Sequence, residues 1–490
     1  MVNSNLKNML SDQGASNIKA DEAPIKWCSV SLSDVISRGK RLEASVFDVE
    51  AKQARQIIKN SKFPSTTIGG ENGLTTSYTC ARFKRIWVEH SDLPIYQPST
   101  IVDIKPTPDG YISHLTQTNI DALRVSKGQI LMTCSGTIGK VSYVSDTLDD
   151  KVFSHDLLRI DCKNSVDQGY IYTYLKSKVG NKILLTNSYG AVITHIESEH
   201  LATVPIPNAP NEIKERIHAL IIKSYELRDE SNALIDQATT LLIDELKLPP
   251  FDDLEQQNLK NASSINAFNV KLSKLSCRAD ASYHLPIVDA IIEHLKNYAE
   301  EVTTIGDACI SSDVVLPGRF KRVYVESDYG VKFLGGKEMK QLDPSSEKYL
   351  SKKAHLKQLQ GSLGIKENSI LTPARGSLGE VVMPPKHFYN WAISDNMMQI
   401  LSNDAVCGYV YIFLNSEYGK ALIQRFTYGG VVDAIEPWHI QQVQIPLLKN
   451  KVVQVQINDL AKQANKKRYE AYLLEQEALK IMDEEVIYAK

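Results

Sequence analysis

The chain contains one pattern of residues twice, and this duplication constrains its fold more than any other feature. The segment Gly169–Pro207 reads GYIYTYLKSKVGNKILLTNSYGAVITHIESEHLATVPIP, and Gly408–Pro446 reads GYVYIFLNSEYGKALIQRFTYGGVVDAIEPWHIQQVQIP. Further blocks follow in the same order at shifts of 237 to 240 residues: RLEAS and RADAS, RFKRIWVEH and RFKRVYVES, SGTIGKV and RGSLGEV, SHDLLRI and SDNMMQI. This period is far too long for a solenoid or a propeller. It predicts two copies of one domain.

The composition is that of an ordinary globular protein, with 490 residues, 43% of them hydrophobic and 23% charged. A length of this kind fits about two to four domains. The net charge of −2 excludes a surface coated in positive charge, but nucleic-acid binding requires only one basic face. Seven scattered cysteines without a CxxC pair favour reduced thiols over a zinc site. Since no signal peptide or membrane-spanning apolar run is present, we expect a soluble, cytoplasmic protein.

Each copy begins with short runs that are typical of β-strands. The runs RIWVEH, IYQPSTIVDI, GQILMTC and KVSYVS in the first copy, and RVYVES, KFLGG, NSILTP and EVVMPP in the second, are rich in Val, Ile and Tyr and bounded by turn residues. The segments 169–185 and 408–426 have the spacing of one amphipathic helix each. Sheets with packed helices predict an α+β fold for each copy.

A long helix is expected after each copy, because residues 211–246 and 451–490 contain neither proline nor glycine. The first of these would span roughly 54 Å. Helices of this length with apolar residues three and four apart usually pair with another helix, so we expect an antiparallel coiled coil. The alternative is that each seam packs on its own domain. The expected seam residues are Ile213, Ile217, Leu220, Leu227, Leu234 and Leu241 in the first helix, and Val453, Ile457, Leu460, Leu474 and Ile481 in the second.

These patterns predict two homologous domains separated by two helices, with approximate two-fold symmetry relating residues 28–207 to 277–446. Pro249 and Pro250 cannot continue a helix and should end the first one. The expected boundaries are a domain over 1–210, a helix over 211–248, a linker over 249–270, a domain over 271–447 and a helix over 448–490.

Three cations in four residues stand at the same place in both copies: Arg82, Lys84 and Arg85 in the first, and Arg319, Lys321 and Arg322 in the second. Clustered cations beside an aromatic ring suit a polyanion, which indicates phosphate contact. The alternative is a solvated strand edge, where lysine discourages aggregation. Because both copies share the motif, it would position DNA without distinguishing one half of a site from the other.

Sequence reading is expected where the copies differ. Residues 337–366 contain seven lysines, among them Lys352 and Lys353, and the first copy has no matching run. Such a run can also be only a solvated face.

The segment GTIGK at 136–140 lacks the spacing of a phosphate-binding loop, and its counterpart at 376–380 ends in an acid. We expect a tight connection between two strands that requires glycine. Thr137 and Lys140 are further candidates for contact with a DNA backbone.

Catalytic patterns are weak. The chain has no amino-methyltransferase tetrad and no glycine fingerprint for a cofactor, and His195 and His200 read as structural. Asp92, Asp103 and Lys105 can be fitted to a nuclease pattern, but the second copy lacks it. We therefore expect no enzyme, no metal and no cofactor. A metal-dependent nuclease and a coiled-coil scaffold with two heads that do not bind DNA remain the alternatives.

The chain resembles the specificity subunit of type I restriction–modification systems over nearly its whole length. The resemblance lies in the order of domain and long helix, repeated once, and in the motifs R(L/A)(E/D)AS, RFKR(I/V)(W/Y)VE, GVKFLGG, GTIGKV or GSLGEV, and GY(I/V)Y followed by YG(A/G)V. It implies a non-catalytic DNA reader in which each target recognition domain binds half of a bipartite site.

The resemblance also implies partners. The helices would set the spacing of the half-sites and bind two methyltransferase subunits, and restriction subunits would join afterwards. On the helices, Ile221, Leu242, Tyr469 and Leu473 lie beyond the expected seam and are candidates for binding the methyltransferase subunits.

Overall fold

The computed structural model of the chain describes residues 29–37, 40–190, 193–254, 268–275, 278–344 and 348–489. The first 28 residues, residue 277 and most of the linker expected at 249–270 lie outside the described residues. The chain divides into two compact units, and the division runs through both long helices. The N-terminal unit comprises residues 18–229 and 470–490, and the C-terminal unit comprises residues 230–469.

The described residues of the N-terminal unit form three small sheets. The first has the antiparallel order β2–β9–β6–β7, formed by Thr75–Tyr78, Leu157–Cys162, Ile130–Thr133 and Val141–Tyr143. The second has the order β3–β5–β4–β8, formed by Trp87–Val88, Gly110–Ile112, Pro94–Tyr96 and Val152–Phe153. The third pairs β1 (Ser65–Thr67) with β10 (Pro205–Pro207). The helices are α2 (Leu32–Ser37), α3 (Val49–Lys59), α4 (Val166–Lys176), α5 (Lys178–Leu185) and α6 (Ser198–Ala202).

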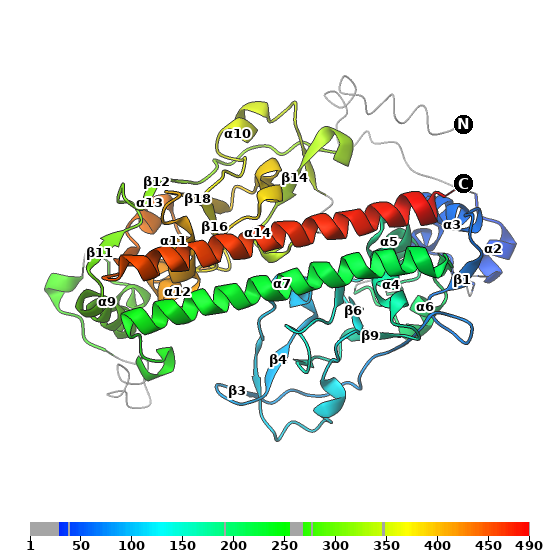
Figure 1. The fold of residues 1–490 in the computed structure, drawn as a ribbon, viewed down its shortest axis with the longest axis horizontal. Helices are drawn as coiled ribbons and strands as arrows, with labels where there is room; N and C mark the ends of the chain where they lie inside the picture. The colour runs from blue at the N-terminus through cyan, green and yellow to red at the C-terminus, as the bar shows by residue number, and fades with distance from the viewer. Residues whose placement is uncertain are drawn as a thin grey trace. The chain divides into compact units, whose positions relative to one another are not determined.

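The C-terminal unit repeats this plan (Figure 1). Its first sheet has the order β12–β18–β16, formed by Ser311–Val315, Met397–Ser402 and Ser369–Pro373. The second has the order β13–β15–β14–β17, formed by Tyr324–Val325, Tyr349–Ser351, Gly330–Leu334 and Ala392–Ile393. The third pairs β11 (Glu301–Thr304) with β19 (Gln444–Leu447). The helices are α9 (Pro286–Tyr298), α10 (Leu356–Gln360), α11 (Cys407–Asn415), α12 (Glu417–Gln424) and α13 (Pro437–Gln441).

The duplication extends to the register of the strands. In the second sheet of the N-terminal unit Trp87 lies opposite Ile112, and in the C-terminal unit Tyr324 lies opposite Leu350 in the equivalent place. In both units the pair that follows, β4 with β8 or β14 with β17, is parallel. The duplicated α+β fold expected from the sequence is therefore confirmed, while the two-fold axis between the copies stays a prediction.

The single helices expected at 169–185 and 408–426 are wrong, since each segment forms two helices. The breaks fall at Ser177 and Ser416, whose side chains cap the second helix by accepting hydrogen bonds from the N–H groups of Gly180 and Gly419. A β-carbon on Gly180 would lie 2.0 Å from the carbonyl oxygen of Tyr174, so the turn between the helices requires glycine. Apolar residues continue on both sides of this break, and the first helix of each pair is buried on nearly all sides, so the sequence alone reads as one helix.

The two long helices are α7 (Asn211–Leu246) and α14 (Lys451–Ile481), and α14 continues into a π-helical turn over Met482–Ile487. The helix α7 ends where expected, just before Pro249 and Pro250. Each long helix passes close to its own domain at a glycine. A β-carbon on Gly169 would lie 2.5 Å from the α-carbon of His218, and one on Gly408 would lie 2.3 Å from the carbonyl oxygen of Asn458. The glycine that opens both GY(I/V)Y motifs is thus required by this close approach.

Within each unit the segments of α7 and α14 also pack against each other, in antiparallel directions. In the N-terminal unit the Ser224 hydroxyl donates to the Ala471 carbonyl oxygen at 2.7 Å, and in the C-terminal unit Lys467 pairs with Glu230 at 2.5 Å. Small residues recur every seven positions along this contact and are fully buried: Ser224, Ser231 and Ala238 on α7, and Ala464, Ala471 and Ala478 on α14. The expected packing of helix on helix is therefore present, together with the alternative packing of each helix on its own domain.

A buried carboxylate joins α14 to the N-terminal domain. Glu475 is 0% exposed and accepts hydrogen bonds from Arg228 of α7, from Lys176 of α4 and from the Tyr172 hydroxyl, the last at 3.1 Å. A shift of 240 residues relates Glu475 to Ile235, which is also buried in the second copy. The two copies therefore differ in the chemistry of their cores although they share a fold.

The buried His387 makes the stability of the C-terminal unit depend on pH. The ring is 7% exposed, and its Nε2–H donates to the carbonyl oxygen of Leu342 at 2.8 Å. Burial lowers the pKa of His387 from 6.5 to about 4. Protonation between these values favours the unfolded chain, so stability should fall as the pH falls from 6.5 to 4, by about 3 kcal/mol.

We expect His387→Gln to flatten the pH dependence of unfolding, because a glutamine amide can still donate to Leu342 but does not titrate. Urea unfolding of the two proteins between pH 7 and pH 4 measures the difference, with the exposed His90 changed to glutamine as the control. Equal slopes for His387→Gln and the unmodified chain would contradict the assignment.

Candidate nucleic-acid interface

The RFKR motif of the first copy lies in an extended segment that leads into β3. Phe83 anchors it, with its ring packed edge-on against His155 at 5.4 Å. Arg82 and Lys84 are exposed, and neither side chain makes a hydrogen bond or ion pair in the part of the chain that the structure describes. Arg85 is half-buried, with its guanidinium 5.8 Å from the centre of the Phe83 ring. Two of the three cations are thus free to meet a phosphate.

The second copy repeats this anchoring with one difference. Phe320 packs edge-on against His355 at 5.2 Å, and Arg319 and Lys321 are exposed. Arg322 instead pairs with Asp395 and lies 5.3 Å from the Phe333 ring. Its charge is partly neutralised, so the exposed pair before it should carry most of any phosphate contact. The role of the six cations in DNA binding stays a prediction.

The anchoring histidines are held neutral. Burial lowers the pKa of His155 most, Asp156 opposes this, and the positive charges of Arg85 and Arg82 lower it further. Burial also lowers the pKa of His355. Each ring therefore adds no charge at neutral pH, and its contribution is to fix the phenylalanine between the cations.

Exposed aromatic side chains stand directly beside these cations, and the sequence reading missed them. Trp87 is 48% exposed and Tyr324 is 45% exposed, each at the start of the strand after its RFKR motif. Tyr111, which lies on the strand paired with β3, is 37% exposed. Aromatic rings interleaved with cations are typical of surfaces that bind nucleic acid. The sequence signal for these exposed rings was the aromatic residue at the third position of RIWVEH and RVYVES.

The glycines of GTIGK and GSLGE have the expected structural role. Gly136 and Gly139 have φ angles of 71° and 79°, and Gly376 and Gly379 have φ angles of 87° and 90°. In the first copy the segment connects β6 to β7, which pair as antiparallel neighbours. Thr137 is exposed at its tip and Lys140 is half-buried. Their contact with a DNA backbone stays a prediction.

Two lysines of the run in the second copy lie on an exposed turn. Lys352 and Lys353 follow the last residue of β15 and precede α10, and both are exposed. The Lys352 N–H donates to the carbonyl oxygen of Tyr329 at 3.3 Å, which fixes the backbone of the turn. This arrangement suits contact with DNA, and the role in base reading remains a prediction.

The residues expected in the helix seam differ in burial. Five of them are buried, namely Ile217, Leu227, Ile457, Leu460 and Ile481, and six are partly buried, namely Ile213, Leu220, Leu234, Leu241, Val453 and Leu474. A neighbouring row on α7 is buried more completely, because it faces both its domain and α14: Ile217, Ile221, Ser224, Arg228, Ser231, Ile235, Ala238 and Leu242. The proposed docking residues Ile221 and Leu242 belong to this row and are 0% exposed, so that expectation was wrong for them.

Two of the residues considered for catalysis, His200 and Asp92, make hydrogen bonds or ion pairs with neighbouring side chains or backbone. His200 Nδ1 accepts a hydrogen bond from the Glu197 N–H at 3.2 Å and completes the cap of α6, as its structural reading predicted. The Asp92 carboxylate pairs with His114 at 2.6 Å on an exposed surface. Among the described residues, no group of three or more His, Cys, Asp or Glu side chains could hold a metal ion.

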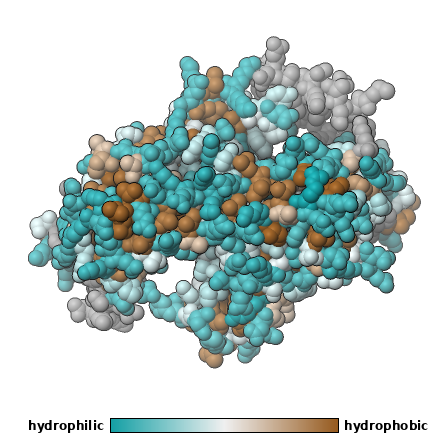
Figure 2. Space-filling view, in the orientation of Figure 1, coloured by the Kyte–Doolittle hydropathy of each residue, from teal (hydrophilic) through white to brown (hydrophobic). Residues whose placement is uncertain are grey.

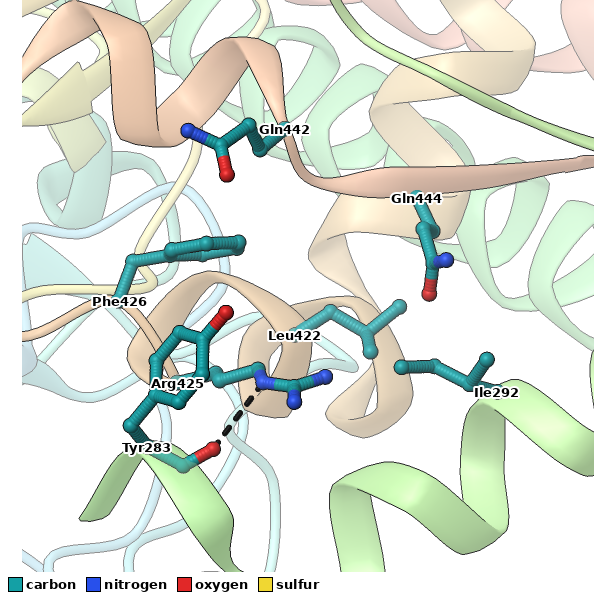
Figure 3. A pocket seen from close by; sticks show the side chains of 7 residues that line it. All are labelled: Tyr283, Ile292, Leu422, Arg425, Phe426, Gln442 and Gln444. Atoms are coloured by element: carbon teal, nitrogen blue, oxygen red, sulfur yellow. Dashed lines mark hydrogen bonds between the residues drawn. The ribbon is translucent and has the colours of Figure 1, made fainter. Parts of the chain in front are cut away.

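A pocket of about 150 Å³ lies in the C-terminal unit, between α9 and α12 (Figure 3). Arg425 crosses it, with its guanidinium 4.5 Å from the Tyr283 ring and its Nε donating to the Tyr283 carbonyl oxygen at 3.1 Å. Pockets for drug-sized ligands measure about 300 Å³ or more, so this one is too small for a nucleotide or a similar cofactor. Across the described ranges, no helix has both the length and the apolar character needed to cross a membrane.

Comparison with known proteins gives one family. The model of the "Type I restriction modification DNA specificity domain" matches residues 24–237. No curated protein gives a match to the chain. Residues 24–237 include the first domain, the RFKR motif of the first copy and the N-terminal part of α7, and the second copy repeats this plan.

Three solved structures are similar over most of the chain. The S subunit of a type I restriction–modification system from M. genitalium is 13% identical, covers 86% of this chain and 96% of its own, and has a TM-score of 0.35. The HsdS subunit from Thermoanaerobacter tengcongensis is 13% identical, covers 86% and 99%, and has a TM-score of 0.24. A structure described as "Structural basis underlying complex assembly and conformational transition of the type I R-M system" is 14% identical. It covers 86% of this chain and 98% of its own, and has a TM-score of 0.25. These scores are too low for the superpositions to support a conclusion.

The family match rests on sequence, and the duplicated domains with their exposed cations are consistent with DNA recognition. Residues 24–237 of the chain are similar to the type I restriction modification DNA specificity domain family.

Proposed function

We propose that this chain is the specificity subunit of a type I restriction–modification complex and that each target recognition domain reads one half of a bipartite DNA site. The observation that carries the proposal is a surface shared by both copies beside one that differs. The shared surface is the RFKR motif with its exposed cations, and the differing one includes Lys352 and Lys353, which have no counterpart in the first copy. Phosphates are alike along DNA whereas base edges differ, so shared cations position the duplex and divergent segments read it.

The long helices are proposed to fix the spacing of the half-sites. Two DNA-binding domains on a helical spacer convert helix length into a distance along the duplex. Linking the two domains also raises the effective concentration of the second after the first has bound.

The helices are also proposed to bind two methyltransferase subunits, and restriction subunits would join this complex. Figure 2 shows apolar side chains gathered along α7 and α14 on an otherwise mostly hydrophilic face. The most exposed of the apolar residues on α14 are Val452, Val455 and Leu473, with 77%, 54% and 46% exposure. They replace Ile221 and Leu242 as candidates for this contact, because those two are covered within their own units.

The subunit itself is proposed to be non-catalytic and cytoplasmic, with methylation and cleavage carried out by its partners. Methylome sequencing of cells with and without the chain tests this function. We expect one bipartite motif to lose its methylation when the chain is removed. Unchanged methylation at every motif would contradict the proposal.

The two alternative functions, a nuclease and a scaffold, predict different experimental results. Metal-dependent cleavage of DNA by the isolated chain, abolished by Asp103→Asn, would favour a nuclease. Failure of the chain and its methyltransferase complex to bind duplex DNA at any salt concentration would favour a scaffold.

A further inference from the structure

The strongest unassigned feature is a loop at residues 428–434 of the C-terminal unit whose tip is apolar and exposed. Val431 is 100% exposed and Val432 is 57% exposed. Tyr428 at the base of the loop and Trp438 on α13 are 40% and 55% exposed. We call these four residues the loop patch. Large apolar side chains exposed together in this way usually mark a binding surface.

The loop is held in one conformation by contacts among its own residues. Tyr428 and Ala434 exchange two backbone hydrogen bonds of 3.0 and 2.8 Å, and the Tyr428 hydroxyl binds the Glu436 carboxylate at 2.6 Å. Gly429 has a φ angle of 115°, and a β-carbon there would lie 2.4 Å from the carbonyl oxygen of Val432. A loop fixed in one conformation loses little entropy on binding.

Two duplicated motifs from distant parts of the unit support this loop. Arg278, of the RADAS motif, donates to the carbonyl oxygen of Thr427 at 2.9 Å. The N–H of Gly376, in the GSLGEV motif, donates to the carbonyl oxygen of Asp433 at 3.2 Å. His439 completes the support, because its ring packs on Tyr428 at 5.5 Å and its Nδ1 accepts from the Glu436 N–H.

The first copy builds the same support. Arg41 donates to the carbonyl oxygen of Ser188 at 2.8 Å, Tyr189 binds Glu197 and packs on His200, and the Gly136 N–H donates to the carbonyl oxygen of Thr194 at 3.0 Å. Ile193 is 54% exposed beside it. A shift of 239 residues places Glu199 where the second copy has Trp438. Since both copies hold this loop with equivalent contacts, we expect the loop of each copy to bind a partner.

The charges around the loop patch favour a protein over DNA. Asp433 within the loop is exposed, and the Glu436 carboxylate lies at its base. Arg375, 3.6 Å from Glu436, is occupied by that carboxylate. An exposed carboxylate beside an apolar tip repels a phosphate backbone, whereas exposed Trp and Tyr are the residues that most often anchor protein interfaces.

We infer that the loop patch is a docking site for a protein subunit that presents an apolar cleft with a basic rim. This inference rests on the proposed function, under which the methyltransferase subunit is that partner. Trp438 is its anchor, and the first copy, with Glu199 in the equivalent place, binds its methyltransferase more weakly. The two methyltransferase subunits therefore bind with unequal affinities.

Binding of the full chain to its cognate methyltransferase, followed by mass photometry across a concentration series, tests the inference. We expect Trp438→Ala combined with Val431→Ser to weaken the tighter of the two binding steps by about 30-fold. Leu272→Ser, at a leucine of the same unit that is 84% exposed, is the matched control and should change nothing. Glu199→Trp should strengthen the weaker step.

Salt-dependent DNA binding of each assembled complex separates the outcomes. Unchanged methyltransferase binding by the double variant would overturn the inference, and so would weaker DNA binding with methyltransferase binding intact, since the loop patch would then contact DNA. Should the unmodified chain bind neither methyltransferase nor DNA, the proposed function would fail with it.

Discussion

Changing Glu475 to alanine should destabilise the N-terminal unit by about 3–5 kcal/mol. The substitution removes the carboxylate that Arg228 and Lys176 share, and it leaves two cations in a site where their side chains are only 10% and 21% exposed. An uncompensated buried charge is far more costly than the ion pair is stabilising. Hydrogen exchange of the slowest amides in β6 and β9 measures the loss in the unit concerned.

The neighbouring residues provide the controls for this experiment. Glu477→Ala removes an exposed acid from the same helix and should change stability by less than about 0.5 kcal/mol. Combining Glu475→Ile with Lys176→Asn introduces the residues that the second copy has in these places, Ile235 and Asn415. We expect this pair to recover part of the loss. A loss below about 1 kcal/mol for Glu475→Ala would show that the cluster is not tightly coupled.

Removing the exposed cations of both RFKR motifs should weaken DNA binding for all sequences alike. The combined change of Arg82, Lys84, Arg319 and Lys321 to alanine removes four candidate phosphate contacts. The slope of log affinity against log salt should then fall by about four units, and the affinity at 0.1 M salt by roughly 1,000-fold. Arg85 and Arg322 should contribute less, because the first is half-buried and the second pairs with Asp395.

A charge-matched variant separates contact from net charge. Changing four other exposed lysines, Lys52, Lys59, Lys466 and Lys480, removes the same charge and should lower the slope by much less. Lys352→Ala and Lys353→Ala should instead change the preference in one half of the site. Binding of the methyltransferase complex to matched and half-mismatched duplexes across salt gives both quantities. Altered base preference from the RFKR changes with an unchanged salt slope would reverse the two roles.

The duplication made most of the fold predictable, because two independent examples of each motif show which residues the fold requires. The long helices, their ends and the strands at RIWVEH and GQILMTC followed from periodicity and turn residues. The breaks at Ser177 and Ser416 did not, because a capping serine followed by a close approach of backbone at Gly180 is a tertiary constraint. The strand expected in EVVMPP is reduced to a single bridge at Val382.

The candidate site was predictable only in part, because contacts between segments distant in sequence again determine which residues are covered. A row of apolar residues shows that a helix is buried, but it does not show how many neighbours cover it. The seam expected on α7 allowed for one partner, whereas the helix contacts both its domain and α14, and this explains why Ile221 and Leu242 are covered. The role of Ser224 could not be recognised from one helix alone, because its hydroxyl donates to the Ala471 carbonyl oxygen of the other helix.

The close contact between each domain and the long helix that follows it limits how such chains can exchange parts. His218 lies against Gly169, the Tyr225 hydroxyl binds the N–H of Tyr143 at 3.1 Å, and Asp229 holds the loop at Ser145 with a bond of 2.8 Å. A hybrid joined at residue 210, where the globular part ends, would separate the domain from all three. A junction after residue 229 would transfer them together, so the heritable module of this protein is a domain with half a helix attached.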